Sequence, residues 1–261
     1  MDRIPDDARA RVYLDTTVIL DYVDQTRGNL NSMNLMQRIK AGNGLTGVIS
    51  TFTIMEAVQQ RQESTHLREL INRGFSLNEI RGQEGSNRNL TLSECRRCFN
   101  DIYRVLNGFG LHIEIRNLGA DDIWIEASRL VQETNICAPD AIHVATALTS
   151  GCDGFVTGDR LLCDQLKKTR RLRKEIVPIL CQRGISDPAF QTQLKAALKK
   201  AKGHAPRKMT TRSQLPAEVK SLFSALYEMS GTKRKPEEEI ASYERSLRNH
   251  INEHIRAKRP A

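Results

Sequence analysis

Residues 11–25, RVYLDTTVILDYVDQ, join two hydrophobic patterns without a break. The first five residues alternate into an apolar run that ends at Asp15, a pattern typical of a buried strand. Apolar side chains then recur at helical spacing, at Val18, Ile19, Tyr22 and Val23. A strand that runs directly into a helix is the first part of a β-α-β unit. This stretch therefore predicts an α/β fold with a carboxylate at the end of its first strand.

The same alternation continues along the chain. Further strands are predicted over residues 45–50, 111–116, 154–157 and 175–180, and helices over 32–42, 51–62, 119–134 and 159–168 and from Pro139 onward. Strands that alternate with helices favour a mostly parallel central sheet, covered by helices on both faces in a three-layer sandwich.

Two segments depart from this alternation of strands and helices. A polar insertion rich in Arg and Asn spans about residues 64–100, and no strand pattern follows residue 181. Residues 189–202 and 237–259 are charged helix candidates in that last part. We therefore expect an α/β domain over residues 1–180 and a basic, mainly helical extension over residues 181–261.

Charge is distributed unevenly along the chain. Residues 1–166 hold 17 Lys and Arg against 22 Asp and Glu, whereas residues 167–261 hold 23 against 9. An acidic first part joined to a strongly basic second part favours a polyanionic partner, and nucleic acid is the commonest polyanion inside cells. A solvated, partly disordered tail would explain the same charge.

Other patterns bear on the cellular compartment. The chain has no run of about 18 or more apolar residues, and its first residues carry acids where a signal peptide would carry a basic flank. The six cysteines are scattered through helix-like and strand-like patterns, so reduced thiols are expected. These patterns predict a cytoplasmic protein without a membrane partner.

Four acids fall at the same edge of the predicted sheet. Asp15 and Asp159 follow predicted strands, and Glu56 and Asp140 lie in the first turns of predicted helices. Ligands of open parallel sheets gather outside the carboxyl ends of the strands. Converging carboxylates repel one another unless a cation compensates, and an oxygen-only ligand set suits Mg²⁺ or Mn²⁺. Such a site supports hydrolysis of phosphodiester bonds. For Asp140 alone, an acid that stabilises the first turn of its own helix is the simpler alternative.

Four short motifs occur in a recognisable order: VYLDTTVIL, STFTIMEAV, PDAIHVATAL and FVTGDRLL. Together they resemble the acidic motifs of PIN-domain ribonucleases, and the resemblance covers about residues 11–180. It implies a PIN-like fold in which Asp15, Glu56, Asp140 and Asp159 are catalytic and hold Mg²⁺ or Mn²⁺. It also implies that Thr16 and Thr157 are supporting hydroxyls.

The general pattern is most similar to VapC-like toxins of toxin–antitoxin pairs, whose chains are shorter. The resemblance therefore implies an endoribonuclease that cleaves RNA, with single-stranded RNA as the expected substrate, an antitoxin or other protein as a partner, and a homodimer as a possible assembly. The insertion and the basic extension depart from the toxin pattern. A nuclease subunit of a defence or RNA-processing assembly and a non-catalytic nucleic-acid-binding scaffold remain alternatives.

Further residues are candidates for supporting roles. His143 lies one helical turn from Asp140, where it would either hydrogen-bond a ligand carboxylate or serve as an ordinary core histidine. The run KKTRRLRK is either an RNA contact or a solvated face, and its basic residues are Lys167, Lys168, Arg170, Arg171, Arg173 and Lys174.

Two other motifs are given structural interpretations. GNGLTG, residues 42–47, matches a dinucleotide-binding pattern but precedes a predicted strand, whereas that pattern must follow one; its glycines are expected to end a helix. Cys95 and Cys98 have the spacing of half a zinc site but no second pair, so they are expected to be ordinary helical cysteines.

Overall fold

The structure, a computed structural model, describes residues 9–24, 29–82, 90–118, 121–182 and 187–201. Within these ranges the chain is α/β, as predicted, with five parallel strands in one central sheet. The strands are β1 (Ala10–Leu14), β2 (Leu45–Ser50), β3 (Ile113–Arg116), β4 (Gly154–Thr157) and β5 (Val177–Leu180). All five overlap predicted strands, because short apolar runs between helical patterns are typical of strands that are buried on both faces.

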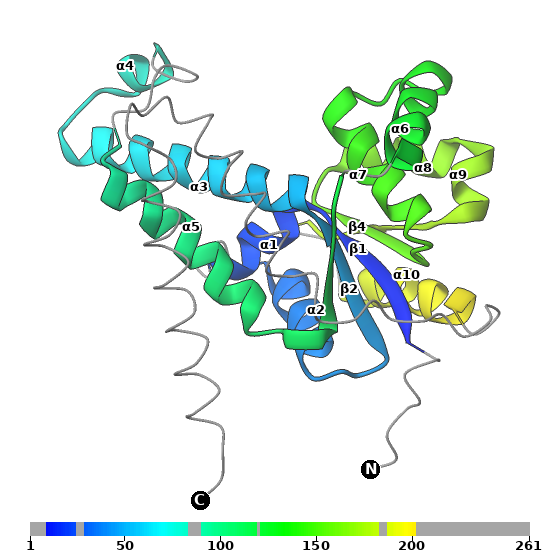
Figure 1. Ribbon diagram of the computed structural model, residues 1–261. Helices are drawn as coiled ribbons and strands as arrows, with labels where there is room; N and C mark the ends of the chain where they lie inside the picture. The colour runs from blue at the N-terminus through cyan, green and yellow to red at the C-terminus, as the bar shows by residue number, and fades with distance from the viewer. Residues whose placement is uncertain (1–8, 25–28, 83–89, 119–120, 183–186, 202–261) are drawn as a thin grey trace, which may run out of the picture. The chain divides into compact units, whose positions relative to one another are not determined.

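The strand order is β3-β2-β1-β4-β5, with β1 in the middle (Figure 1). Tyr13 of β1 pairs with Val48 of β2 on one side and with Phe155 of β4 on the other. The chain therefore adds β2 and β3 on one side of β1 and then returns to add β4 and β5 on the other. This reversal creates a topological switch point between β1 and β4, and ligands of open α/β sheets bind at such points.

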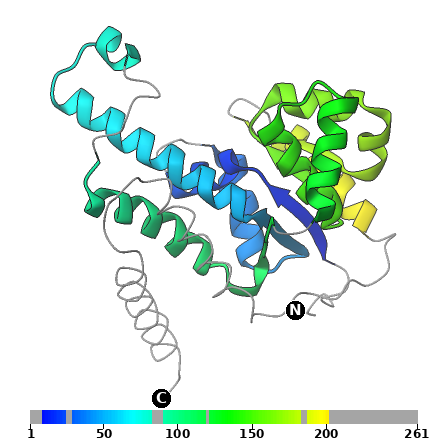
Figure 2. The same ribbon diagram turned by 45° about the horizontal axis from the view of Figure 1, so that its top comes forward.

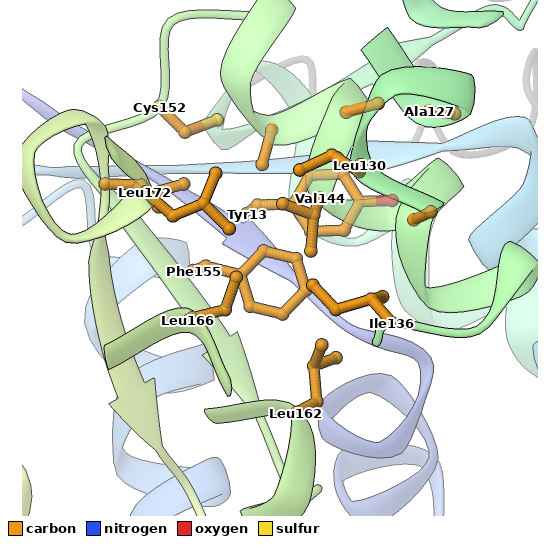
Figure 3. Packing of buried hydrophobic residues seen from close by; sticks show 14 of the residues in the cluster. Tyr13, Ala127, Leu130, Ile136, Val144, Cys152, Phe155, Leu162, Leu166 and Leu172 are labelled. Atoms are coloured by element: carbon orange, nitrogen blue, oxygen red, sulfur yellow. The ribbon is translucent and has the colours of Figure 1, made fainter. Parts of the chain in front are cut away.

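One face of the sheet packs against α6 (Asp121–Glu133), α7 (Ala138–Thr149), α8 (Arg160–Lys168) and α9 (Arg170–Glu175). Tyr13, Val48 and Phe155 contribute the strand side of this core. Figure 3 shows Tyr13 and Phe155 packed with Leu130 and Val144 of the helical side. The Tyr13 and Phe155 rings are stacked with their centroids 5.4 Å apart. These strand residues share a face because side chains alternate along a strand.

The other face packs against α2 (Leu30–Lys40) and α10 (Asp187–Ala201), and α1 (Thr16–Val23) follows β1 on that side (Figure 1). A Cβ atom at Gly154 would lie 3.2 Å from the Cβ of Ala197 in α10, and one at Gly47 would lie 3.5 Å from Ile39 in α2. The sheet is thus covered on both faces, which is compatible with the predicted three-layer sandwich.

Helix α10 occupies part of the predicted basic extension. Phe190, Leu194 and Ala197 are fully buried, and the Gln193 side chain accepts a hydrogen bond from the Leu180 amide at 2.8 Å. The described start of the extension therefore packs on the sheet as an element of the α/β unit. The described residues all belong to one compact unit. Residues 202–261, which include the helix candidate at 237–259, lie outside the described residues.

The polar insertion is largely helical where it is described. Helix α3 (Thr51–Asn72) continues beyond its predicted end at residue 62 and is followed by α4 (Leu77–Gly82) and α5 (Leu92–Asn107). Helices α3 and α5 lie side by side (Figures 1 and 2), and Arg61 and Asp101 pair across them at 3.4 Å. A one-turn 3-10 helix, Gly110–His112, leads into β3, which begins later than predicted.

The remaining sequence predictions concern single motifs. Gly42 and Gly44 have φ angles of 67° and 70° and connect α2 to β2, so the prediction that they end a helix is confirmed. Cys95 and Cys98 are free thiols within α5. Among the helices of the described ranges, none combines the length and the apolar character needed to cross a lipid bilayer.

Candidate functional site

The candidate site lies where β1 and β4 end, at the switch point of the sheet. Asp15 follows β1 directly, and its amide donates a hydrogen bond to the Val156 carbonyl of β4 at 3.0 Å. Asp159 follows β4 after Gly158. The strand order therefore places the loops that carry these two acids beside each other.

Asp15 is fixed by its own helix and by β4. It caps α1, and its Oδ1 atom accepts a hydrogen bond from the Thr16 amide at 2.7 Å. Its Oδ2 atom accepts hydrogen bonds from the Thr157 hydroxyl at 2.7 Å and from the Thr17 hydroxyl at 3.4 Å. The side chain is held in one orientation by these bonds, and the residue is only 7% exposed.

Glu56 lies in the second turn of α3 and faces α1 and α7. Its Oε2 atom is 2.7 Å from the Thr16 hydroxyl, which donates to it, and 2.7 Å from His143 Nε2. Burial acts to raise the pKa of Glu56, but the hydrogen bond and charge of His143, with the Thr16 hydroxyl, lower it below its ordinary value. Glu56 is therefore an ionised carboxylate whose Oε2 atom is engaged by two donors.

His143 connects the acids to the core. It is 2% exposed, and its Nδ1 atom lies 2.9 Å from the Tyr13 hydroxyl. Its Nε2 atom also lies 3.9 Å from Asp15 Oδ1. Burial acts to lower the pKa of His143, but the hydrogen bond to Glu56 and the charges of Asp15, Glu56 and Asp140 raise it overall. Both interpretations of His143 from sequence therefore describe it: a buried core histidine that also bonds a site carboxylate.

The residues behind His143 were not singled out from the sequence. The Tyr13 hydroxyl donates to Ser50 Oγ at 3.0 Å and lies 2.9 Å from Thr53 Oγ1. Ser50 and Thr53 also form the capping box that begins α3. Strand alternation offered a signal for Tyr13, because it lies two residues before Asp15 and so on the same face. No signal in the sequence indicated the contact between Tyr13 and His143, which lie 130 residues apart.

Asp140 lies in the first turn of α7 and is half-buried. Burial raises its pKa above the ordinary value, and the Asp15 and Asp159 carboxylates raise it further, against the effects of Cys137 and His143. The exposed Cys137 thiol donates to Asp140 Oδ2 at 2.9 Å, a contact that the sequence did not indicate. The Asp15 and Asp159 carboxylates therefore lie close enough to Asp140 to disfavour its charged form.

Asp159 is exposed and caps α8. Its Oδ1 atom accepts from the Leu161 and Leu162 amides at 2.7 and 3.1 Å, and its own amide donates to the Thr157 hydroxyl at 2.9 Å. Thr157 thus contacts both Asp15 and Asp159.

The donor chemistry of this edge suits a hard divalent cation, because Asp15, Asp140 and Asp159 provide only oxygen ligands. Their mutual repulsion is the condition that such a cation relieves. Within the described ranges, however, no group of three or more His, Cys, Asp or Glu side chains is already arranged to hold a metal ion. The carboxylates therefore fit the cation by chemistry and by position at one edge, and their side chains would have to converge on it.

The predicted RNA-contacting residues lie away from the acids. Lys167 and Lys168 are in the last turn of α8, whose first turn is capped by Asp159, and the others are in α9. Arg171 is half-buried and pairs with Glu126 at 2.7 Å, Glu133 at 3.3 Å and Glu175 at 3.4 Å. Arg171 is thus engaged with carboxylates of its own chain, whereas the other five basic side chains are exposed.

Comparison with known proteins adds no assignment: no family model matches the chain, and a search of curated proteins found no match. The function is therefore argued from the residues of the site.

Proposed function

We propose that this chain is a PIN-like, Mg²⁺- or Mn²⁺-dependent ribonuclease that hydrolyses phosphodiester bonds of RNA. The observation that carries the proposal is the presence of Asp15, Asp140 and Asp159 at the switch point of a parallel sheet, with the pKa of Asp140 raised by burial and by the other two acids. Carboxylates gathered at a ligand-binding edge, one of them with a raised pKa, are expected where a cation belongs.

When bound, the metal would activate water near neutral pH and neutralise charge on the attacked phosphodiester. Side chains and amides of the chain would orient the carboxylates that hold the metal. Thr157 and the Thr16 amide fix the two oxygens of Asp15, so that little freedom is lost on binding. His143 and the Thr16 hydroxyl hold the Oε2 atom of Glu56. Asp140 and Asp159 complete the set from the first turn of α7 and the cap of α8.

RNA is proposed as the substrate because the basic part of the chain favours a polyanion and because the four motifs resemble those of ribonucleases. The role of toxin in a toxin–antitoxin pair, with a protein inhibitor, is the corresponding biological proposal. A nuclease subunit of a larger assembly would use the same chemistry, and gene neighbourhood separates these two roles.

The test is incubation of the purified protein with end-labelled single-stranded RNA and DNA of the same sequence, in Mg²⁺, Mn²⁺ or chelator. The proposal predicts metal-dependent cleavage of RNA that chelator abolishes and that Asp15→Asn removes. Cleavage at the wild-type rate in the Asp15→Asn protein would contradict the role of Asp15 in the proposed site. Binding of RNA without cleavage in either metal would instead identify a non-catalytic scaffold and refute the proposal.

A further inference from the structure

Exposed cations gather on three helices at the end of the domain away from the acids. Lys167 and Lys168 end α8, Arg170, Arg173 and Lys174 lie in α9, and Lys199 lies in the last turn of α10. All six side chains belong to exposed residues. We refer to these six residues as the distal basic surface.

Helix α10 joins this surface through direct contacts. The Lys200 ammonium group donates to the Lys174 carbonyl at 2.9 Å and also to the Glu175 carbonyl. These contacts bring the C-terminal end of α10 against the C-terminal end of α9. A run that is continuous in sequence, Lys167–Lys174, is thereby extended in space by a helix that begins 13 residues later, at Asp187.

The acids nearest to α9 do not cancel its charge. Arg171 pairs with Glu126, Glu133 and Glu175, and Arg129 also pairs with the first two. Two cations therefore neutralise much of the charge of these three carboxylates. Lys167 lies 3.9 Å from Asp164, and the other Lys and Arg side chains of the distal basic surface are left as a surplus of positive charge. Such a surplus is the electrostatic footprint of a polyanion-binding surface.

The distal basic surface and the acids lie at opposite ends of the sheet. Helix α9 leads into Val177, which pairs with Gly154, the first residue of β4, whereas Asp159 follows the last residue of that strand. Helix α8 connects the two ends, with Asp159 as its cap and Lys168 as its last residue. At about 1.5 Å per residue, the nine residues from Asp159 to Lys168 separate this acid from this cation by about 14 Å along the helix.

We propose that the distal basic surface is an RNA-anchoring site, which makes the enzyme selective for RNAs long enough to reach it from the acids. This inference rests on the ribonuclease activity proposed above. The acidic edge repels phosphate groups at long range, so affinity must come from positive charge elsewhere on the domain. An RNA that follows α8 has its phosphates neutralised at the far end, while its scissile bond lies at the carboxylates. A short RNA at the carboxylates gains nothing from this surface.

The test replaces one residue of α9 and two flanking cations by neutral side chains of similar length: Lys168→Gln, Arg173→Gln and Lys199→Gln. The matched control removes three exposed cations from α3 and α5 with Arg68→Gln, Arg97→Gln and Arg104→Gln. Both proteins lose the same net charge, so a difference between them reports location. Circular dichroism and melting show that each variant is folded.

Binding is measured first, by fluorescence anisotropy of a 30-nucleotide single-stranded RNA in chelator over a series of salt concentrations. Each lost phosphate contact makes the log–log salt slope shallower by about 0.7. The distal variant should therefore lose about 2 units of slope, and the control variant should keep the wild-type slope. Equal slopes in the wild type and the distal variant, or equal losses in both variants, would overturn the proposal.

Length dependence is measured next, by cleavage in Mg²⁺. For the 30-nucleotide RNA the distal variant should show a KM raised about 10-fold or more with little change in kcat, because a uniform binding contribution is lost. For a dinucleotide, whose single phosphodiester would lie at the carboxylates, the two proteins should have the same kcat/KM. An equal loss on both substrates would contradict an anchor that only long RNA reaches.

Two outcomes separate this inference from others. If the wild type binds RNA through the distal basic surface but does not cleave it in either metal, the proposed ribonuclease activity fails and the binding surface stands. If the three substitutions abolish binding to phosphatidylserine vesicles but leave RNA binding unchanged, the surface is a membrane contact and the RNA-anchoring proposal is wrong.

Discussion

Asp15, Asp140 and Asp159 are held by different contacts, and this decides how each responds to substitution. Asp15 is buried and bonded at both oxygens, Asp140 is half-buried beside Cys137, and Asp159 caps a helix. Asparagine preserves the volume of each side chain and remains a good helix cap, but it removes the negative charge that a cation needs.

Asp15→Asn, Asp140→Asn and Asp159→Asn should each lower kcat for RNA cleavage by more than about 100-fold, because losing even an outer-shell partner of a metal costs 10- to 100-fold. Steady-state cleavage of labelled RNA in Mg²⁺ measures the effect. Asp164→Asn is the matched control: Asp164 also lies on α8, and its contact with Lys167 is a long 3.9 Å. Wild-type rates in all three site variants would refute the site.

Two substitutions of His143 test whether its hydrogen bond to Glu56 matters for activity. A glutamine amide reaches about as far as Nε2 and restores a donor to Glu56, whereas the shorter asparagine amide reaches only the position of Nδ1, toward Tyr13. His143→Asn should therefore lower kcat by about 10- to 100-fold and weaken the activation by Mg²⁺, while His143→Gln should stay within a few-fold of wild type. KM for RNA should change little in either protein.

The comparison between the two His143 variants separates positioning from packing. A purely structural histidine would give losses that follow the melting temperatures of the variants, whichever amide is present. Equal kcat values for His143→Gln and His143→Asn would show that the donor to Glu56 is not what matters.

At the scale of elements, strand positions were predictable because a buried strand in a parallel sheet is a short apolar run. Strand order was not predictable, since pairing joins residues as distant as Val12 and Gly154. The packing of α10 on the sheet was also missed. The sequence predicted a charged helix over residues 189–202, but nothing in it identified Gly154 as the surface against which Ala197 packs.

In the candidate site, too, local features could be predicted from the sequence and long-range contacts could not. Asp15 and Asp159 could be proposed from the sequence because the apolar pattern shows where strands end. Asp140 and Glu56 could be proposed because the sequence also shows where helices begin. The contacts that orient these acids join residues that the fold brings together, such as Thr157 with Asp15. The ion pairs of Arg171 with Glu126 and Glu133 are equally non-local, so the sequence could not distinguish Arg171 from its exposed neighbours.

The packing of α10 on β4 can be tested with a double-mutant cycle. Gly154→Ala places a methyl group 3.2 Å from the Ala197 Cβ and 2.9 Å from Ile179 Cδ1, which should destabilise the protein by about 1–3 kcal/mol. Ala197→Gly should cost about 1 kcal/mol in α10, but it also makes room for the new methyl group. The double variant should therefore be about 1 kcal/mol more stable than the sum of the single changes in urea denaturation. Additive effects would mean that the two residues are not in contact.

At the scale of the whole molecule, the acids should couple metal binding to stability. A ligand at 100 times its Kd stabilises the folded state by about 2.7 kcal/mol, which for a chain of this size raises Tm by about 5–10 °C. Thermal melts in chelator and in rising Mg²⁺ or Mn²⁺ should show this increase. A Tm that is independent of either metal would count against the site.

Asp140→Asn should change the Tm measured without metal and also the increase in Tm that Mg²⁺ causes. Because the pKa of Asp140 is raised in the folded state, ionisation of this carboxyl lowers the free energy of unfolding. This loss of stability is absent below the ordinary pKa of 3.8 and develops as the pH rises through the pKa of the folded state. At pH 7 and without metal, Asp140→Asn should therefore raise Tm slightly, and this gain should vanish at acidic pH. The variant should also lose most of its response to Mg²⁺. A lower metal-free Tm at pH 7 would contradict the repulsion of Asp140 by Asp15 and Asp159.

The central claim is that the carboxylates at the switch point between β1 and β4 bind a divalent cation. Anomalous diffraction from crystals soaked in Mn²⁺ tests this most directly, because the signal locates the ion without any assumption about activity. The account predicts a peak with oxygens of Asp15, Asp140 and Asp159 at about 2.0–2.3 Å, which disappears in crystals of Asp15→Asn. Crystals that show no peak at this edge, at a Mn²⁺ concentration that supports RNA cleavage in solution, would contradict it.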